Sequence, residues 1–148
     1  MSSGVDAAGW AADTWWSMSQ ENVDLALRAY EAFNRRDWDA FVALMDDDVE
    51  IVTRIAVIEG GRHGHDGMRR WWETMLAAFP DYDIEVVDVR DLGEVTLASL
   101  RAVGHGAGSE VPFEDLLWHA GRWRRGRCVW WRAFETEAEA LEAVGLGE

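Results

Sequence analysis

Histidine is the side chain best suited to moving protons near neutral pH, and the sequence holds four of them. His119 lies in the middle of an apolar stretch, so we expect it to be the most buried of the four. It is a candidate acid–base residue for a cavity, and the alternative is a hydrogen-bonded structural or interface histidine. His63 and His65 lack obvious further ligands, and His105 lies in a glycine-rich loop. The histidines therefore predict one proton-transfer candidate and no metal site.

The remaining charged and nucleophilic side chains give weaker signals. Arg54, on a predicted strand, can bind an anionic group or stack on an aromatic ring. Glu114 and Asp115 are adjacent carboxylates on a later strand. The three aspartates at 46–48 do not follow the ligand spacing of a calcium loop. Cys128 stands in an apolar run, which is typical of a buried and inert thiol rather than of a nucleophile.

Composition excludes several classes of function. The chain has 148 residues and a formal net charge of −14, which disfavours binding to nucleic-acid backbones. Its 14 basic residues are all arginine, so no lysine can form a Schiff base. A phosphate-binding glycine loop and a nucleophile elbow are both missing. Because the sequence has neither a membrane-length apolar run nor a secretory signal, we expect a cytoplasmic protein. We also expect that it needs no cofactor.

Hydrophobic periodicity predicts the elements that must position these side chains. We predict a helix that opens at Ser19, a short helix capped by Asp37, and a third helix stopped by Pro80. Residues 92–94 and 124–126 are typical of hairpin turns. Strands are predicted at residues 49–58, 82–91, 95–104, 111–123 and 127–134, and a last short helix at 135–144.

These elements predict a single α+β domain. Helices segregated to one face of a curved antiparallel sheet give that class of fold. Residues 1–17 show no periodicity, and Met18 looks like a second chain start. We therefore predict a mobile N-terminal extension over residues 1–17 and one domain over residues 18–148.

The order of the elements and several sequence landmarks resemble the SnoaL-like branch of the nuclear-transport-factor-2-like superfamily. The landmarks are AYEAFNRRDW from Ala29, DDVE from Asp47, GHDGMR from Gly64 and RRGR from Arg124. The resemblance implies a cone, in which three N-terminal helices wrap a strongly bent sheet that is open at one end over an apolar cavity. Members include ketosteroid isomerases, polyketide cyclases, dehydratases and proteins without catalysis, so the fold alone does not give the function.

The resemblance also suggests site residues. Isomerase members use a tyrosine as oxyanion donor, a carboxylate on the first strand as base and a protonated aspartic acid on a later strand. In the alignment with these isomerases, Tyr30 stands at the position of the tyrosine, Thr53 at that of the base and Trp118 at that of the second acid. Neither Thr53 nor Trp118 can do acid–base work, so Tyr30 and His119 remain the catalytic candidates. The expected pocket lining comprises Thr53, Arg54, Trp72, Trp118 and Trp131.

The predicted strand at 111–123 decides which side chains face the cavity. Both of its alternating sets contain apolar residues, so both faces are expected to be covered, one by the cavity and the other by a partner subunit. If Trp118 faces the cavity, Asp115 and His119 face the dimer interface, which argues against their catalysis. A shift of one residue in the alignment reverses this assignment.

Two functions follow. The first is a homodimeric enzyme without a cofactor, a cyclase, isomerase or dehydratase that acts on a small and largely apolar carbonyl compound. The second is a non-catalytic homodimer that binds an apolar ligand or fills its cavity with tryptophan, since the sequence holds ten tryptophans. In both cases the dimer forms through the outer face of the sheet, and no nucleic acid or membrane takes part.

Overall fold

The computed structural model describes residues 7–53 and 62–145, and side chains from Gln20 onward within those ranges. Six strands form one curved, open sheet in the order β2-β1-β6-β5-β4-β3. The strands are β1 (Met45–Val52), β2 (Arg62–His63), β3 (Asp83–Leu92), β4 (Val95–His105), β5 (Pro112–Arg124) and β6 (Arg127–Phe134). Strands β1 and β6 run parallel, and every other neighbouring pair is antiparallel. The predicted four-strand meander is therefore confirmed.

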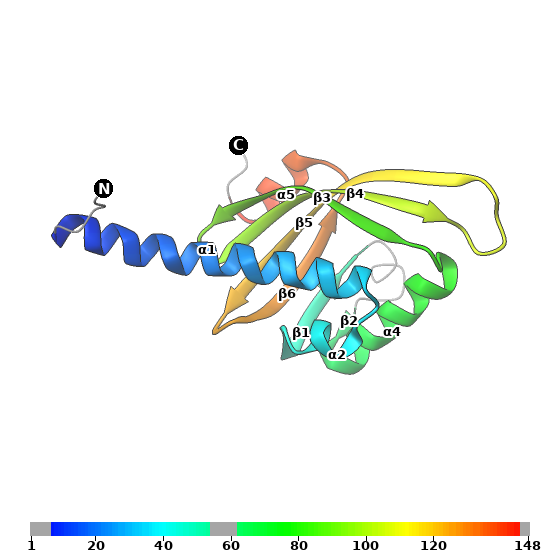
Figure 1. Ribbon diagram of the computed structural model, residues 1–148, viewed down its shortest axis with the longest axis horizontal. Coiled ribbons are helices and arrows are strands. Elements are labelled where there is room, and N and C mark those ends of the chain that lie inside the picture. Colours follow the sequence, from blue (N-terminus) through cyan, green and yellow to red (C-terminus); the bar gives the residue numbers. More distant parts are fainter. Residues whose placement is uncertain (1–6, 54–61, 146–148) are drawn as a thin grey trace.

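Three helices lie on the concave face of the sheet, and one short helix lies on the other face. Helix α1 (Ala7–Asn34) runs across the concave face, with α2 (Trp38–Val42) and α4 (Gly64–Ala78) beside its C-terminal end (Figure 1). The short helix α5 (Glu137–Ala143) packs on the other face, against β5 and β6. This arrangement confirms the predicted α+β class. Within the described parts of the chain, no helix is long and apolar enough to cross a membrane.

Helix α1 begins earlier than the sequence predicts. We expected it to open at Ser19, but it begins at Ala7 and its first turns extend past the edge of the sheet (Figure 1). The added segment is rich in alanine, the residue with the highest helix propensity, and holds no proline. Ser19 is therefore a residue of the helix interior and not its cap. The mobility of residues 1–17 stays a prediction.

Two local predictions are confirmed by backbone geometry. The carboxylate of Asp37 accepts a hydrogen bond from the Ala40 amide at 3.1 Å and so caps α2. The loop between β5 and β6 consists of Arg125 and Gly126, whose φ angles are 54° and 77°. Two consecutive residues with positive φ make the type I′ turn that matches the twist of a hairpin.

Strand β1 begins at Met45 rather than at Val49. Met45, Val49 and Ile51 are buried, whereas Asp47 and Asp48 are exposed. The three aspartates therefore belong to the start of this strand, and the side chains of Asp47 and Asp48 face water. The second half of the predicted strand, residues 54–58, lies outside the described residues.

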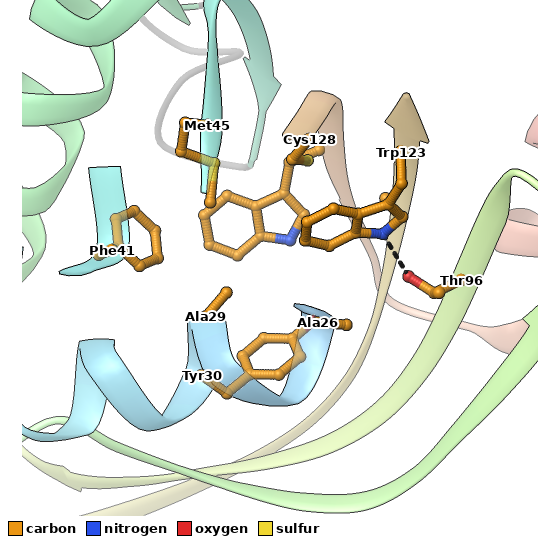
Figure 2. A pocket seen from close by; sticks show the side chains of 10 residues that line it. Ala26, Ala29, Tyr30, Phe41, Met45, Thr96, Trp123 and Cys128 are labelled. Atoms are coloured by element: carbon orange, nitrogen blue, oxygen red, sulfur yellow. Dashed lines mark hydrogen bonds between the residues drawn. The ribbon is translucent and has the colours of Figure 1, made fainter. Parts of the chain in front are cut away.

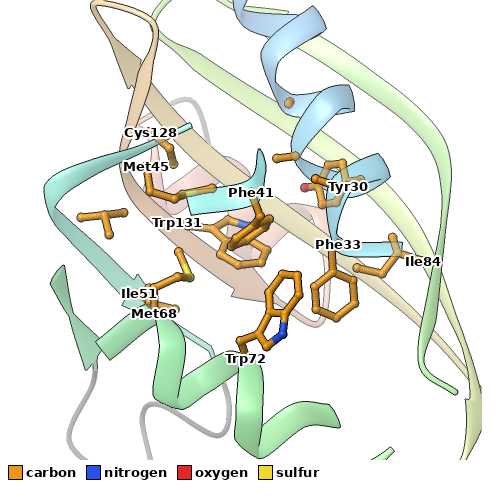
Figure 3. Close-up of a cluster of buried hydrophobic side chains, with 14 of the residues drawn as sticks. Tyr30, Phe33, Phe41, Met45, Ile51, Met68, Trp72, Ile84, Cys128 and Trp131 are labelled. Atoms are coloured by element: carbon orange, nitrogen blue, oxygen red, sulfur yellow. The ribbon is translucent and has the colours of Figure 1, made fainter. Parts of the chain in front are cut away.

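An aromatic core lies between the helices and the concave face of the sheet. Phe33 of α1 is 1% exposed and contacts Phe41, Trp71 and Trp72, with ring centroids 5.1–6.3 Å apart. Figure 3 shows Phe33 and Phe41 with Trp72 below them and Trp131 of β6 behind Phe41. These rings join α1 to α4 and fix both helices above the sheet.

Polar contacts hold the end of α1 on the sheet. The Asn34 Nδ2 group donates to the Ile84 carbonyl at 2.8 Å, and the Ile84 amide donates to Asn34 Oδ1 at 2.9 Å. The Asn34 side chain thus makes with the Ile84 backbone the two hydrogen bonds that a neighbouring strand would make. It fixes the last turn of α1, and with it Tyr30 one turn earlier, relative to the sheet.

Candidate functional site

A cavity of about 740 Å³ lies between α4 and the concave face of the sheet. Most of its lining is aromatic or aliphatic, with a few polar side chains. The lining residues are Thr53, Trp71, Met75, Phe79, Tyr82, Ile84, Gly106, Ser109, Val111, Pro112, Phe113, Glu114, Asp115, Leu117, His119 and Ala133. An apolar concavity with a small number of polar groups is the usual form of a small-molecule site.

Strand β5 supplies the histidine and the carboxylates among the residues that line this cavity. Its inward positions include Asp115, Leu117 and His119, all of which line the cavity. Trp118 is opposite Ser99 on β4 and packs with the apolar cluster under α5, on the outer face. The prediction that Trp118 lines the pocket is therefore wrong.

The physical reason is the two-residue period of a strand. Sequence alternation showed which side chains of β5 share a face, but not which face lies under α1 and α4. Moving Trp118 to the outer face moves Asp115 and His119 to the inner one. The expectation that these two side chains face a dimer interface is wrong for the same reason.

His119 and Tyr30 form a buried pair at the inner end of the cavity. The Tyr30 hydroxyl and His119 Nδ1 are 3.2 Å apart, and the two side chains are 8% and 5% exposed. Trp131 packs edge-on against the His119 ring, with centroids 4.8 Å apart at 88°. His119 lines the cavity, whereas Tyr30 lies behind it, in the core. Of the two predicted catalytic residues, His119 lines this cavity and Tyr30 does not.

Burial sets the charge state of this pair. Desolvation disfavours the imidazolium ion and lowers the pKa of His119 to about 3, so the ring is neutral at physiological pH. Desolvation also raises the pKa of Tyr30, which stays a phenol. The pair therefore offers neutral hydrogen-bonding groups and carries no charge.

A second, much smaller space of about 20 Å³ is lined by side chains that include Tyr30, Phe41 and Trp123 (Figure 2). It has room for about one water molecule. The Trp123 indole donates to Thr96 Oγ1 at 2.9 Å beside it, and the thiol of Cys128 borders it. Burial raises the pKa of Cys128 to about 12, so the thiol is protonated and unreactive, as predicted.

The other predicted lining residues fall in different places. Thr53 lines the large cavity. Trp131 borders the water-sized space, and Trp72 packs against Phe33 and Phe41 in the core instead of lining either space. Arg54 lies outside the described residues.

Comparison with known proteins places this architecture in a family. A profile of the SnoaL-like domain matches residues 26–136, which include the cavity wall and the Tyr30–His119 pair. The chain belongs to the SnoaL-like domain family. No protein with a curated description matches the sequence.

Solved structures share the fold of this SnoaL-like domain at low sequence identity. An NTF2-like protein of unknown function from Burkholderia pseudomallei is 19% identical, with a TM-score of 0.71 over 84% of this chain and 98% of that chain. A putative SnoaL-like polyketide cyclase from Jannaschia is 15% identical, with a TM-score of 0.71 over 88% and 95%. A putative polyketide cyclase from Streptomyces antibioticus is 24% identical, with a TM-score of 0.67 over 83% and 97%.

Sequence reasoning missed one polar pair, which lies outside the lining of the large cavity and joins the start of β3 to the end of β4. Asp81 accepts from the His105 amide at 2.8 Å and lies 2.7 Å from His105 Nδ1. These hydrogen bonds hold the pKa of Asp81 below its usual range. Nothing in the local sequence joins the two residues, because they meet only through the pairing of β3 with β4. Within residues 7–53 and 62–145, no three His, Cys, Asp or Glu side chains form a group that could hold a metal ion.

Proposed function

We propose that this SnoaL-like protein binds a small, largely apolar carbonyl compound and converts it without a cofactor, by cyclisation, isomerisation or loss of water. One observation carries the proposal. His119 is the neutral polar group at the inner end of a mainly apolar cavity, and it has a hydrogen-bonded tyrosine behind it. The cavity volume of about 740 Å³ falls in the range of small-molecule sites. Two neighbours in fold that are putative polyketide cyclases support the same chemistry.

The direction of the Tyr30–His119 hydrogen bond determines what His119 offers a ligand. A buried hydroxyl proton needs an acceptor, and His119 Nδ1 is the acceptor that lies within reach of the Tyr30 oxygen. If Nδ1 accepts, the single proton of the neutral imidazole is on Nε2. We infer that Tyr30 sets this tautomer and that His119 donates a hydrogen bond from Nε2 to a ligand.

A neutral imidazole N–H can polarise a carbonyl group and stabilise the oxyanion of the enolate that forms when a base removes the α-proton. In this scheme a base from solvent, hydroxide or a buffer anion, accepts that proton and a proton from solvent later returns to carbon. An enolate is an intermediate common to aldol-type cyclisation, double-bond isomerisation next to a ketone, and elimination of water from a β-hydroxy ketone. The apolar wall strengthens such a hydrogen bond because it excludes water. In this scheme His119 is the catalytic residue and Tyr30 is a positioning residue.

The alternative of a cavity filled with tryptophan has less support. Trp72 and Trp131 pack in the core under the cavity, and Trp118 packs on the outer face. These three side chains leave the space of about 740 Å³ open.

The proposal is tested with 2-acetylnaphthalene and with 2-isopropenylnaphthalene, which has nearly the same planar shape but a CH2 group in place of the carbonyl oxygen. Binding is followed by tryptophan fluorescence, and enolate formation by deuterium exchange at the ketone methyl group in D2O. We expect the ketone to bind up to about tenfold more tightly, which is the worth of one hydrogen bond. We also expect His119→Leu to remove this preference and to lower the exchange rate about 10²-fold.

Two further variants separate chemistry from folding. His119→Gln retains an N–H donor and should recover part of the ketone preference. Tyr30→Phe leaves the imidazole in place but frees its tautomer, so it should weaken the preference and change the pH dependence of exchange. If His119→Leu binds and exchanges the ketone as the unaltered protein does, the proposed function is wrong.

We also propose that the protein is a homodimer joined through the outer face of the sheet. On this face Leu116 is 60% exposed, and Arg122 and Arg132 lie over the ring of Trp130 at 5.5 and 4.8 Å. What supports this surface is that an exposed aliphatic side chain and a half-buried aromatic ring lie on the same outer face of the sheet, although not side by side.

Charge placed on that surface should separate the subunits. We expect Leu116→Glu to shift the mass measured by light scattering from dimer to monomer. Val87→Glu is the matched control, because Val87 is 66% exposed on the edge strand β3. A monomer in the unaltered protein, or a Leu116→Glu variant that remains dimeric, contradicts this interface.

A further inference from the structure

Three aromatic side chains line the cavity at a distance from His119. Phe79 follows the last turn of α4, Tyr82 precedes β3, and Phe113 lies near the start of β5. The ring centroid of Phe113 is 4.9 Å from that of Phe79 and 5.9 Å from that of Tyr82. All three side chains are partly exposed and line the cavity. We call Phe79, Tyr82 and Phe113 the ring wall.

Arg36 holds the turn that carries two of these rings. Its guanidinium group donates to the Phe33 carbonyl at 3.0 Å, to the Pro80 carbonyl at 3.2 Å and to the Tyr82 carbonyl. It also lies over the ring of Phe33, 5.3 Å from the centroid, and that ring packs edge-on against Tyr82. Two of the three acceptors belong to the turn between α4 and β3. The Arg36 side chain therefore ties the end of α1 to the ring wall.

The backbone of Arg36 indicates that this side chain has a specific role. Its φ angle is 61°, in the left-handed region that residues other than glycine seldom adopt. Glycine would take up the same conformation without strain. A strained residue persists where the surrounding structure holds it there. At this position the arginine supplies the hydrogen bonds to the turn, which glycine cannot make.

The ring wall and His119 lie far apart in one cavity. Phe113 and His119 are on the same face of β5 and six residues apart, which corresponds to about 20 Å. Trp71, Met75 and Leu117 line the same cavity and add to its apolar surface. A ligand that contacts both His119 and the ring wall is therefore elongated and largely apolar.

We propose that the ring wall binds the apolar tail of an elongated ketone whose carbonyl group lies at His119, and that Arg36 is the positioning residue that fixes this wall. The inference rests on the proposed function of the cavity as a ligand site. A wall that is already in place binds the tail without a further loss of side-chain freedom. Without the Arg36 hydrogen bonds the turn and its two rings gain freedom, and contact with the tail is lost.

A series of methyl ketones tests the tail site, because its members differ in chain length alone. Dissociation constants of 2-pentanone, 2-octanone and 2-undecanone are measured by tryptophan fluorescence. We expect the affinity to rise about two- to fourfold for each added methylene group that becomes buried.

Variants of Arg36 test the positioning role. Arg36→Gly suits the positive φ angle but removes the guanidinium group, so the variant should fold and should bind 2-undecanone several-fold more weakly, with a much smaller loss for 2-pentanone. Arg36→Lys keeps the charge but has one nitrogen in place of the planar fork, so it should recover only part of the length dependence. Arg35→Gln is the matched control, because Arg35 pairs with Glu31 at the surface and its loss should leave the length dependence intact.

Three results would overturn the inference: equal affinity for the three ketones, a length dependence that Arg36→Gly leaves unchanged, or equal losses for the short and the long ketone in that variant. His119→Leu keeps the two proposals distinguishable, since it should weaken all three ketones by the same factor. If that factor is observed while affinity ignores chain length, the tail site is wrong and the proposed function stands. If chain length matters through Arg36 while His119→Leu binds the ketones normally, the tail site stands and the carbonyl chemistry is wrong.

Discussion

Acidification from pH 7.5 to pH 5 should lower the free energy of unfolding by about 2 kcal/mol through His119 alone. Burial lowers the pKa of this histidine from 6.5 in the unfolded chain to about 3 in the folded protein. Between these values the unfolded state binds the extra proton, so stability falls as the pH falls. The slope is about 1.4 kcal/mol per pH unit for one fully displaced titration. Above about pH 6.5 the contribution is fully present and does not change with pH.

Urea unfolding at the two pH values measures this effect. His119→Gln keeps a partner for the Tyr30 hydroxyl but cannot take up a proton, so its loss of stability on acidification should be smaller by about 2 kcal/mol. His63→Gln is the matched control, because His63 is exposed before the first turn of α4 and should keep the full slope. Equal slopes in the unaltered protein and His119→Gln would show that the buried imidazole does not resist protonation.

Features set by a few neighbouring residues could be predicted from the sequence. The Asp37 cap needs one carboxylate and an amide three residues later, and the Arg125-Gly126 turn needs two residues that accept positive φ. Helix α4 ends at Ala78, two residues before Pro80, which cannot continue a helix. Each of these features depends on contacts inside one short segment.

The face of β5 could not be predicted in the same way. Both alternating sets of this strand are apolar because α1 and α4 cover one face while α5 covers part of the other. A pattern that is apolar on both faces carries no sign of which face holds the cavity. The position of His119 therefore required the pairing of β5 with β4 and β6, which is a long-range property.

The Asp81–His105 pair could not be predicted from the sequence either, because it also depends on the register of two strands. Asp83 is opposite Val103 and Leu92 is opposite Val95, with a register shift between Val86 and Asp88. Continuing the register beyond Asp83 brings Asp81 opposite His105, where the hydrogen bonds form. Without the bulge, Asp81 would lie opposite the next residue along. One extra residue in β3 thus decides which residue of β4 meets Asp81.

Phe33→Ala should lower the free energy of unfolding by about 3–5 kcal/mol, because it empties the centre of the aromatic core. The side chain is 1% exposed and touches Phe41, Trp71, Trp72 and Tyr82. The loss is a large part of the roughly 5–15 kcal/mol that stabilises a domain of this kind. Urea unfolding, followed by tryptophan fluorescence at pH 7.5, measures it.

Phe113→Ala is the matched control, since it makes the same chemical change at a partly exposed ring of the cavity wall. It should destabilise the protein much less, because less surface returns to water. Phe33→Ala should also weaken ketone binding, since Phe33 supports Trp71, which lines the cavity. If the two variants lose equal stability, the core is not centred on Phe33. If Phe33→Ala leaves ketone binding unchanged, the cavity wall is rigid without the core ring that packs behind it.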